Sequence, residues 1–354
     1  MASTLFSPLT IRELTLKNRI AVSPMCQYSS DNGFANDWHL VHLGSRAAGG
    51  AALVFTEAAA VEPIGRISPQ DLGIYLDQHV EFLSRITAFV ETQGAAAGIQ
   101  IAHAGRKAST ASPWNGGKAV PAAEGGWTPA GPGTDAFDVG YAVPAEMTTA
   151  QIEETVSSFG HAALRSLEAG FKVVEIHGAH GYLLHSFCSA LSNHRADAYG
   201  GDFAGRTRIV REVVQEVRRH WPERLPLFLR ISSTDWTPGG WDIEQSVQLA
   251  RDVGPLGVDL IDASSGGNVP HAPIPVAPGY QTPFAAQIRR EAHILTGAVG
   301  MVTSPVQAEH LLQTGQADMV LLAREMLRDP YWPRRAAAEL KSEITPPVQY
   351  QRAW

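Results

Sequence analysis

The stretch Val173-Val-Glu-Ile-His177-Gly-Ala-His180-Gly-Tyr182 joins a short β-branched run to a turn that carries two histidines and a tyrosine. Runs of this kind alternate with longer amphipathic stretches along the chain, and eight such units can be counted. The predicted strands cover residues 20–22, 52–56, 98–102, 173–177, 227–231, 258–262, 299–302 and 319–323. The predicted helices between them include residues 79–92, 150–168, 206–220, 243–253, 305–313 and 325–340.

Strands that alternate with helices form a parallel sheet, because each strand is reached through a helical crossover. Eight units in 354 residues favour a closed (β/α)8 barrel of the TIM type over an open sheet. We therefore expect an α/β protein with one domain over residues 1–354. Two long connections, residues 105–147 and 265–283, follow the third and sixth strands, on the face where barrel enzymes hold their active site. The first of them is predicted to be a lid.

The composition points to small-molecule partners. The net charge is −7 and no basic run occurs, which argues against a nucleic-acid or anionic-membrane surface. The longest apolar run, residues 47–55, is far shorter than the ~20 residues that span a bilayer. The first twenty residues lack the pattern of a signal peptide, so a cytoplasmic location is expected. Cys26 and Cys188 have neither disulfide-framework nor metal-site spacing.

Polar side chains follow most of the predicted strands, where a barrel places its reactive groups. They are Cys26 and Tyr28 after the first strand, Glu57 after the second, Gln100 in and His103 after the third, His177, His180 and Tyr182 at the fourth, Arg230 in the fifth, Ser264 and Ser265 at the sixth, and Arg324 at the eighth. A candidate active site is expected where these strand ends meet.

The densest cluster is His177, His180 and Tyr182, with His185 nearby. Two imidazoles on one tight turn can donate hydrogen bonds to a ligand oxygen or coordinate a metal. Because no Asp, Glu or Cys at a nearby strand end completes a metal site, we expect an oxygen-binding pair and no metal. A metal-dependent barrel hydrolase or lyase that uses the two histidines remains the alternative, as do purely structural histidines. Tyr182 fits either a proton donor or a packed ring.

Gly300 and Arg324 lie where barrels often bind phosphate, at the seventh and eighth strands. The guanidinium of Arg324 suits phosphate, although Arg324 can equally pair with Asp329. The sequence contains neither a GxGxxG motif after a strand nor a GxxxxGK[ST] motif. A Rossmann dinucleotide domain and a P-loop are therefore disfavoured, and a nicotinamide cofactor would bind without a domain of its own.

Residues 177–182 (HGAHGY) and 192–206 (SNHRADAYGGDFAGR) make the sequence resemble the Old Yellow Enzyme family of flavin-dependent ene reductases. The resemblance extends over essentially the full chain. Residues 23–28 (SPMCQY), 100–107 (QIAHAGRK) and 349–354 (QYQRAW) are similar to the bacterial thermophilic-like subclass, which has a cysteine at the position of Cys26.

This resemblance implies a barrel that holds FMN noncovalently across the strand ends, with NADPH or NADH as electron donor. The implied flavin contacts are Pro24, Met25, Cys26, Ala58, Gln100 and Arg230 at the ring, and Gly300, Met301, Ala323 and Arg324 at the phosphate. The family further implies that His177 and His180 hold the carbonyl or nitro oxygen of an activated alkene. It also implies that Tyr182 protonates the α-carbon of that alkene. Cys26 and Tyr28 would contact the substrate.

The C-terminal segment, residues 346–354, follows two prolines that cannot continue a helix. Tyr350, Arg352 and Trp354 have the composition of an interface anchor, although a frayed terminus is the usual fate of the last residues. The resemblance implies that Arg352 reaches the active site of a neighbouring subunit. We therefore expect a homodimer or homotetramer.

Overall fold

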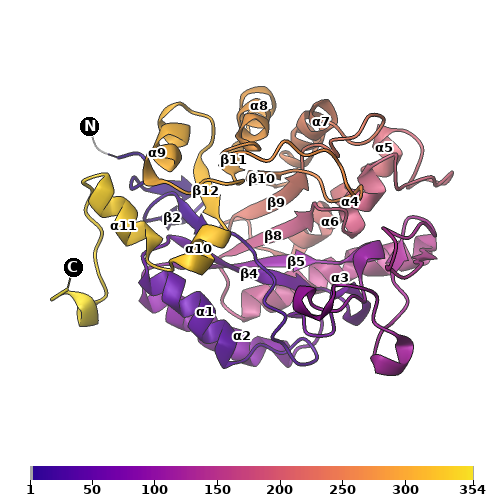
Figure 1. Cartoon of the computed structure of the whole chain (residues 1–354), viewed down its shortest axis with the longest axis horizontal. Helices are drawn as coiled ribbons and strands as arrows, with labels where there is room; N and C mark the ends of the chain where they lie inside the picture. The colour runs from indigo at the N-terminus through magenta and orange to yellow at the C-terminus, as the bar shows by residue number, and fades with distance from the viewer. Residues whose placement is uncertain (1–2, 354) are drawn as a thin grey trace.

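The computed structural model describes residues 3–353 and contains a closed barrel of eight parallel strands (Figure 1). The strands are β3 (Ile20–Val22), β4 (Leu53–Ala60), β5 (Ala96–Ala102), β8 (Val173–Gly178), β9 (Leu227–Ser232), β10 (Leu260–Ser264), β11 (Leu295–Ala298) and β12 (Met319–Leu322). They pair in chain order, and β12 closes the barrel by pairing with β3. The predicted α/β barrel is confirmed.

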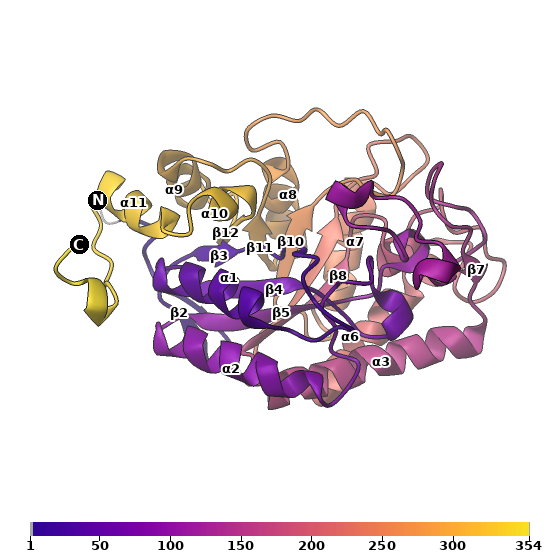
Figure 2. The ribbon, with the colours of Figure 1, turned by 60° about the horizontal axis from the view of Figure 1, so that its bottom comes forward.

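Helices surround the barrel (Figure 2). They are α1 (Asp37–Ala48), α2 (His79–Thr92), α3 (Thr149–Glu168), α4 (Leu183–Cys188), α5 (Phe203–Arg206), α6 (Arg208–His220), α7 (Ile243–Val253), α8 (Thr282–Ala292), α9 (Pro305–Gln313), α10 (Arg324–Arg328) and α11 (Trp332–Glu339). In α6, Ile209, Val213 and Val217 recur at fourfold spacing and are buried. This apolar stripe packs the helix onto its neighbours, as amphipathic periodicity requires.

A short antiparallel hairpin, β1 (Leu9–Ile11) and β2 (Leu14–Leu16), covers one end of the barrel. Its Leu9 and Leu16 join a buried cluster with Phe55, Phe228 and Leu260 from the barrel strands. The barrel strands begin at this end, and the side chains of this cluster fill the interior of the barrel there. The opposite end, where the parallel strands finish, remains for a site.

Two predicted elements are wrong. Residues 299–302 form a loop in which Gly300 has φ 118° and Met301 has φ 52°, and the seventh strand is Leu295–Ala298 instead. The positive φ values are incompatible with an extended strand. The predicted helix over residues 325–340 is divided into α10 and α11 around Pro330, because proline disfavours helical backbone before it and lacks an N–H.

The predicted second strand is too short. β4 continues to Ala60, so Glu57 and Ala58 lie within the strand rather than after it, and its pairing with β5 shifts register between Phe55 and Ala58. Residues 105–147 contain only η2 (Gly105–Lys107), η3 (Pro113–Asn115), η4 (Ala122–Glu124), β6 (Ala130–Gly131) and β7 (Ala145–Glu146). Within residues 3–353, no helix combines the length and the apolar character that a membrane crossing requires.

Candidate active site

A cavity of about 420 Å³ opens where the last strands of the barrel end. It brings together eight residues predicted from the sequence, namely His180, Arg230, Ser264, Ser265, Gly300, Met301, Ala323 and Arg324. Tyr280, Gln281 and Arg328 also line it. Its volume lies in the range of ~300 to 1,000 Å³ that is usual for small-molecule sites.

One side of this cavity is suited to an anion. Arg324 and Arg328 both line it, and guanidinium groups bind phosphate through paired N–H donors. Asp329, the alternative partner of Arg324, lies 3.0 Å from Arg335 instead. The loop at Gly300 has little space for a side chain, because an added Cβ would lie 2.8 Å from Nε2 of Gln281. These residues fit the phosphate of FMN.

The interior of the barrel below the cavity carries buried ionisable side chains. Nε of Arg230 lies 3.2 Å from Oδ2 of Asp262, and Nη1 of Arg230 donates to Oγ of Ser23 at 3.1 Å. Nε2 of Gln100 donates to Oε1 of Glu175 at 2.7 Å. Burial, together with the nearby Asp262 carboxylate, raises the pKa of Glu175 to about 8.

This network explains how the predicted Gln100 and Arg230 are held, and it includes two residues that the sequence analysis missed. Glu175 and Asp262 are ionisable residues in the middle of largely apolar strands. Such residues are rarely buried without partners, and this is the signal that identifies them. The amide of Gln100 and the guanidinium of Arg230 offer the polar contacts that the pyrimidine edge of a flavin requires.

The rings of His177, His180 and Tyr182 form one cluster. The His177 ring centroid lies 5.2 Å from that of His180 and 5.0 Å from that of Tyr182. Burial and the charge of Arg230 lower the pKa of both histidines well below the usual value. Each imidazole therefore stays neutral at neutral pH and keeps one N–H to donate. Burial raises the pKa of Tyr182, so that its hydroxyl keeps its proton.

The position of each ring follows from local contacts. His177 belongs to β8, and its Nδ1 accepts the N–H of Ala179 at 3.3 Å, which leaves Nε2 to carry the proton. Nε2 of His180 lies 2.7 Å from Oγ of Ser264. Tyr182 precedes α4, and it lines a small enclosed cavity with His177 and Ala58.

The loop after β3 contains Pro24, Met25, Cys26 and Tyr28, as predicted. Burial raises the pKa of the Cys26 thiol well above its usual value, so the thiol is protonated at neutral pH. The sulfur lies within 4.8 Å of carboxylate oxygens of Glu57 and Asp71. Burial and the charge of Glu57 raise the pKa of Asp71 to about 8. Glu57 is among the residues predicted at the strand ends, whereas Asp71 was not predicted from the sequence.

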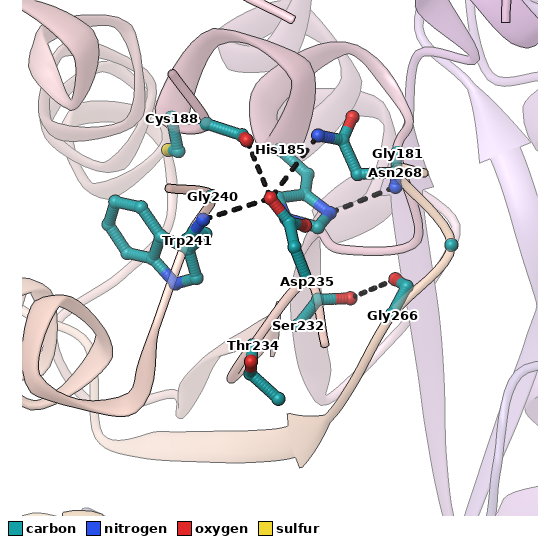
Figure 3. Close-up of polar contacts among 12 residues, drawn as sticks. Gly181, His185, Cys188, Ser232, Thr234, Asp235, Gly240, Trp241, Gly266 and Asn268 are labelled. Carbon is teal, nitrogen blue, oxygen red and sulfur yellow. Dashed lines mark hydrogen bonds and ion pairs between the residues drawn. The ribbon is translucent and has the colours of Figure 1, made fainter. Parts of the chain in front are cut away.

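Three residues named from the sequence lie elsewhere. His103 is buried with its Nε2 3.6 Å from Glu62. His185 is buried next to the turn at Gly181, with its Nε2 3.0 Å from Oδ1 of Asp235 (Figure 3). Arg352 is exposed in a C-terminal segment that extends away from the barrel (Figures 1 and 2) and lines neither cavity. Trp354 lies outside the described residues.

The described part of the chain also has a depression of about 720 Å³, lined by Lys17, Arg334 and Ile344, among others. It lies at the strand starts, below the C-terminal segment, and away from the histidine cluster. The chemistry expected of a barrel enzyme belongs to the opposite face.

Comparison with known proteins finds matches over almost the whole chain. Residues 4–343 match the NADH:flavin oxidoreductase / NADH oxidase family. An NADPH dehydrogenase of Bacillus subtilis (strain 168) is 49% identical over 356 residues, which is 100% of both chains. The structure of a 2-naphthoyl-CoA reductase in complex with 2-naphthoyl-CoA aligns with a TM-score of 0.87 and 26% identity, over 95% of this chain and 52% of that chain. Morphinone reductase in complex with tetrahydroNAD aligns with a TM-score of 0.79 and 23% identity, over 97% and 92%.

Proposed function

Because this chain belongs to the NADH:flavin oxidoreductase / NADH oxidase family, the family of the Old Yellow Enzymes, we propose that it reduces activated C=C bonds. Family membership makes it an FMN-dependent oxidoreductase that takes electrons from NAD(P)H, as an NADPH dehydrogenase does. The proposed substrates are enones, maleimides and nitroalkenes. The observation that carries this proposal is the cluster of His177, His180 and Tyr182 beside the cavity that contains Arg230.

Each of these side chains has a separate task. The N–H groups of His177 and His180 donate to the carbonyl or nitro oxygen and draw electron density from the double bond. FMN, when bound, supplies the hydride that adds to the β-carbon. The Tyr182 hydroxyl then gives its proton to the α-carbon, and the tyrosinate regains a proton from water. Arg230 stabilises negative charge at the flavin, because a fixed guanidinium in a dry site needs no reorganisation.

The remaining predicted residues bind cofactor and substrate in this proposal. Pro24, Met25, Cys26, Ala58 and Gln100 contact the flavin ring, whereas Gly300, Met301, Ala323 and Arg324 hold its phosphate. Cys26 and Tyr28 contact the substrate. Support for segment 105–147 as a lid comes from Trp114, whose ring meets that of Tyr28 edge-on at a centroid distance of 5.4 Å.

We further propose a cytoplasmic homodimer or homotetramer in which Arg352 completes the active site of a neighbouring subunit. Its support is the described part of the C-terminal segment, residues 346–353, which extends away from the barrel of its own chain (Figure 2). The alternative, a metal-dependent hydrolase or lyase, has no support from the NADPH dehydrogenase relatives. Among residues 3–353, the group with metal-ligand spacing is Cys26, Glu57 and Asp71, and it does not include the two histidines.

The test is stopped-flow kinetics of the two half-reactions, with the wild type and Tyr182→Phe. NADPH should bleach the flavin at similar rates in both proteins. Reoxidation by cyclohexenone should be ~10² to 10⁴-fold slower in the variant, which lacks the proton donor. Reoxidation by a nitroalkene should slow much less, because its stable nitronate can be protonated later by water. Equal losses for both oxidants would contradict the role of Tyr182, and no reoxidation by any alkene would contradict the substrate class.

A further inference from the structure

The turn that presents His180 and Tyr182 has an unfavourable backbone. His180 has φ 59° and Gly181 has φ 73°, so two successive residues are in the left-handed region. A non-glycine residue is strained there and stays only where its surroundings hold it. Gly181 cannot be replaced at low cost, because an added Cβ would lie 2.3 Å from the carbonyl oxygen of Gly267.

Three side chains hold this turn through its main-chain groups. Oγ of Ser232 accepts the N–H of His180 at 2.9 Å, and Nζ of Lys107 donates to the carbonyl oxygen of His180 at 2.9 Å. Nδ1 of His185 accepts the N–H of Gly181 at 2.9 Å (Figure 3). His185 is thus the side chain that holds the residue directly before Tyr182.

The same contact determines which nitrogen of His185 carries the proton. Nδ1 accepts a hydrogen bond and therefore has a free lone pair, so the proton lies on Nε2. Nε2 lies 3.0 Å from Oδ1 of Asp235. A proton on Nε2 is needed there, because the lone pair of a bare Nε2 would repel the carboxylate oxygen. A doubly protonated imidazole would set an N–H against the N–H of Gly181.

The Asp235 carboxylate is itself held in place by hydrogen bonds. Oγ of Ser189 donates to its Oδ2 at 2.6 Å. The N–H of Trp241 donates to the same oxygen at 2.9 Å (Figure 3). Burial by itself would raise the pKa of Asp235, but His185 and these hydrogen bonds lower it to about 2. The carboxylate is therefore charged at neutral pH.

We infer that Asp235 and His185 are positioning residues for alkene reduction: the carboxylate fixes the imidazole, and the imidazole holds the turn that places His180 and Tyr182. This inference deepens the proposed function and rests on its assignment of Tyr182 and His180. Neither positioning residue touches the reacting atoms. Their effect is on the geometry of the proton transfer, for which a displacement of ~1 Å can cost about a hundredfold in rate.

Two substitutions of nearly equal shape isolate the contact with Gly181. His185→Leu and His185→Asn both remove the contact with Asp235, but the Asn oxygen takes the place of Nδ1 and can accept the N–H of Gly181. We expect His185→Leu to slow reoxidation of the reduced holoenzyme by cyclohexenone about 10- to 100-fold. His185→Asn should restore most of that rate, although both variants lose similar thermal stability.

His220→Leu is the matched control, because Nε2 of His220 also pairs with a carboxylate, that of Glu216 at 3.1 Å, but on α6, outside the candidate active site. It should leave reoxidation unchanged. FMN content and reduction by NADPH are measured for every variant, so that a general loss of structure is seen directly. If His185→Leu yields no holoenzyme, Asp235→Asn takes its place, with a smaller loss of the same kind expected.

The combination with Tyr182→Phe separates this inference from the proposed function. If His185 acts through Tyr182, His185→Leu should cost much less in the Tyr182→Phe background than in the wild type. A slow Tyr182→Phe enzyme together with a wild-type rate for His185→Leu would overturn the positioning role alone. Equal losses in His185→Leu and His185→Asn would also overturn it. A wild-type rate for Tyr182→Phe would instead overturn the assignment of the proton donor.

Discussion

Arg230 and Asp262 face each other inside the barrel, with 3.2 Å between Nε of the guanidinium and Oδ2 of the carboxylate. The register of β9 and β10 places the two residues directly opposite each other, and both are buried. A buried guanidinium with a paired carboxylate cannot move into solvent at low cost. The positive charge at the base of the cavity is therefore fixed before any ligand binds.

Arg324→Ala should weaken FMN binding strongly. Each charge-assisted hydrogen bond to the phosphate is worth ~1.5 to 3 kcal/mol, which is roughly a 10- to 100-fold change in Kd. Ultrafiltration of the yellow holoenzyme and measurement of free flavin report this change. Arg335→Ala is the control, since Arg335 pairs with Glu325 and Asp329. Unaltered retention in Arg324→Ala, or FAD in place of FMN, would contradict the phosphate site.

Replacement of both His177 and His180 by Ala should abolish the long-wavelength charge-transfer band that forms when a phenolate stacks on oxidised flavin. The donors that hold the phenolate oxygen are then absent. Reoxidation by an enone should slow more than reduction by NADPH. A titration with p-chlorophenol and stopped-flow rates measure both effects. Enone reoxidation at the wild-type rate, with the band lost, would show that the histidines bind oxygen without activating the alkene.

Cys26→Ser should shift the flavin midpoint potential and the KM for enones, while turnover stays within about tenfold, because a protonated thiol is not a nucleophile. The raised pKa of Cys26 also predicts slow alkylation by iodoacetamide at pH 7, with faster reaction only in strong base. Cys188→Ser is the control for the loss of a thiol, because burial raises the pKa of Cys188 to about 12 and this thiol is also protonated at pH 7. Complete loss of activity with flavin retained would indicate covalent chemistry by Cys26.

Asp235→Asn should destabilise the protein most at neutral pH. The pKa of Asp235 is about 2 in the folded protein and ~3.9 when unfolded, so the charged carboxylate favours the folded state above the unfolded pKa. This contribution, about 3 kcal/mol, is lost as the pH falls from ~4 to ~2. Urea unfolding of the wild type and the variant at several pH values should show a difference that shrinks in acid. Asp77→Asn, at an exposed ion pair with Arg165, should show little difference at any pH. A constant difference for Asp235→Asn would refute the coupling.

Deletion of residues 351–354 should weaken subunit association and raise the KM for enones. FMN content should change little, because the cavity with Arg324 lies within one barrel. Sedimentation velocity and steady-state kinetics provide the measurement, and Arg352→Ala separates the arginine from the rest of the segment. An unchanged oligomer with an unchanged KM would mean that the C-terminal segment has no part in the site.

The local sequence pattern was sufficient to predict the barrel. Periodicity of two or 3.6 residues depends only on near neighbours, and the strand Ile20–Val22 and the helices His79–Thr92 and Ile243–Val253 were predicted with their observed bounds. Parallel strands all end on one face, so the meeting of Arg230 and Arg324 also followed from their places along the strands.

The errors arose where backbone conformation overrides side-chain pattern. The run 299–302 is rich in apolar side chains, but Gly300 and Met301 have positive φ and form a loop of the cavity. The stretch 325–340 has helical periodicity, but Pro330 divides it. A hydrophobic pattern records which side chains are buried, and it does not record how the main chain turns.

Only the tertiary structure decided which polar residues meet. Gln100 and Glu175 are 75 positions apart, and His185 and Asp235 are 50 apart, so no local spacing joins them. In the sequence, His185 looks like a third histidine of the site, whereas in the fold it lies next to the turn and holds Gly181. Strand register and loop paths bring such partners together, and these depend on the packing of the whole chain. The sequence therefore determined the barrel and the face that carries the chemistry, and the three-dimensional packing decided how each reactive side chain is held.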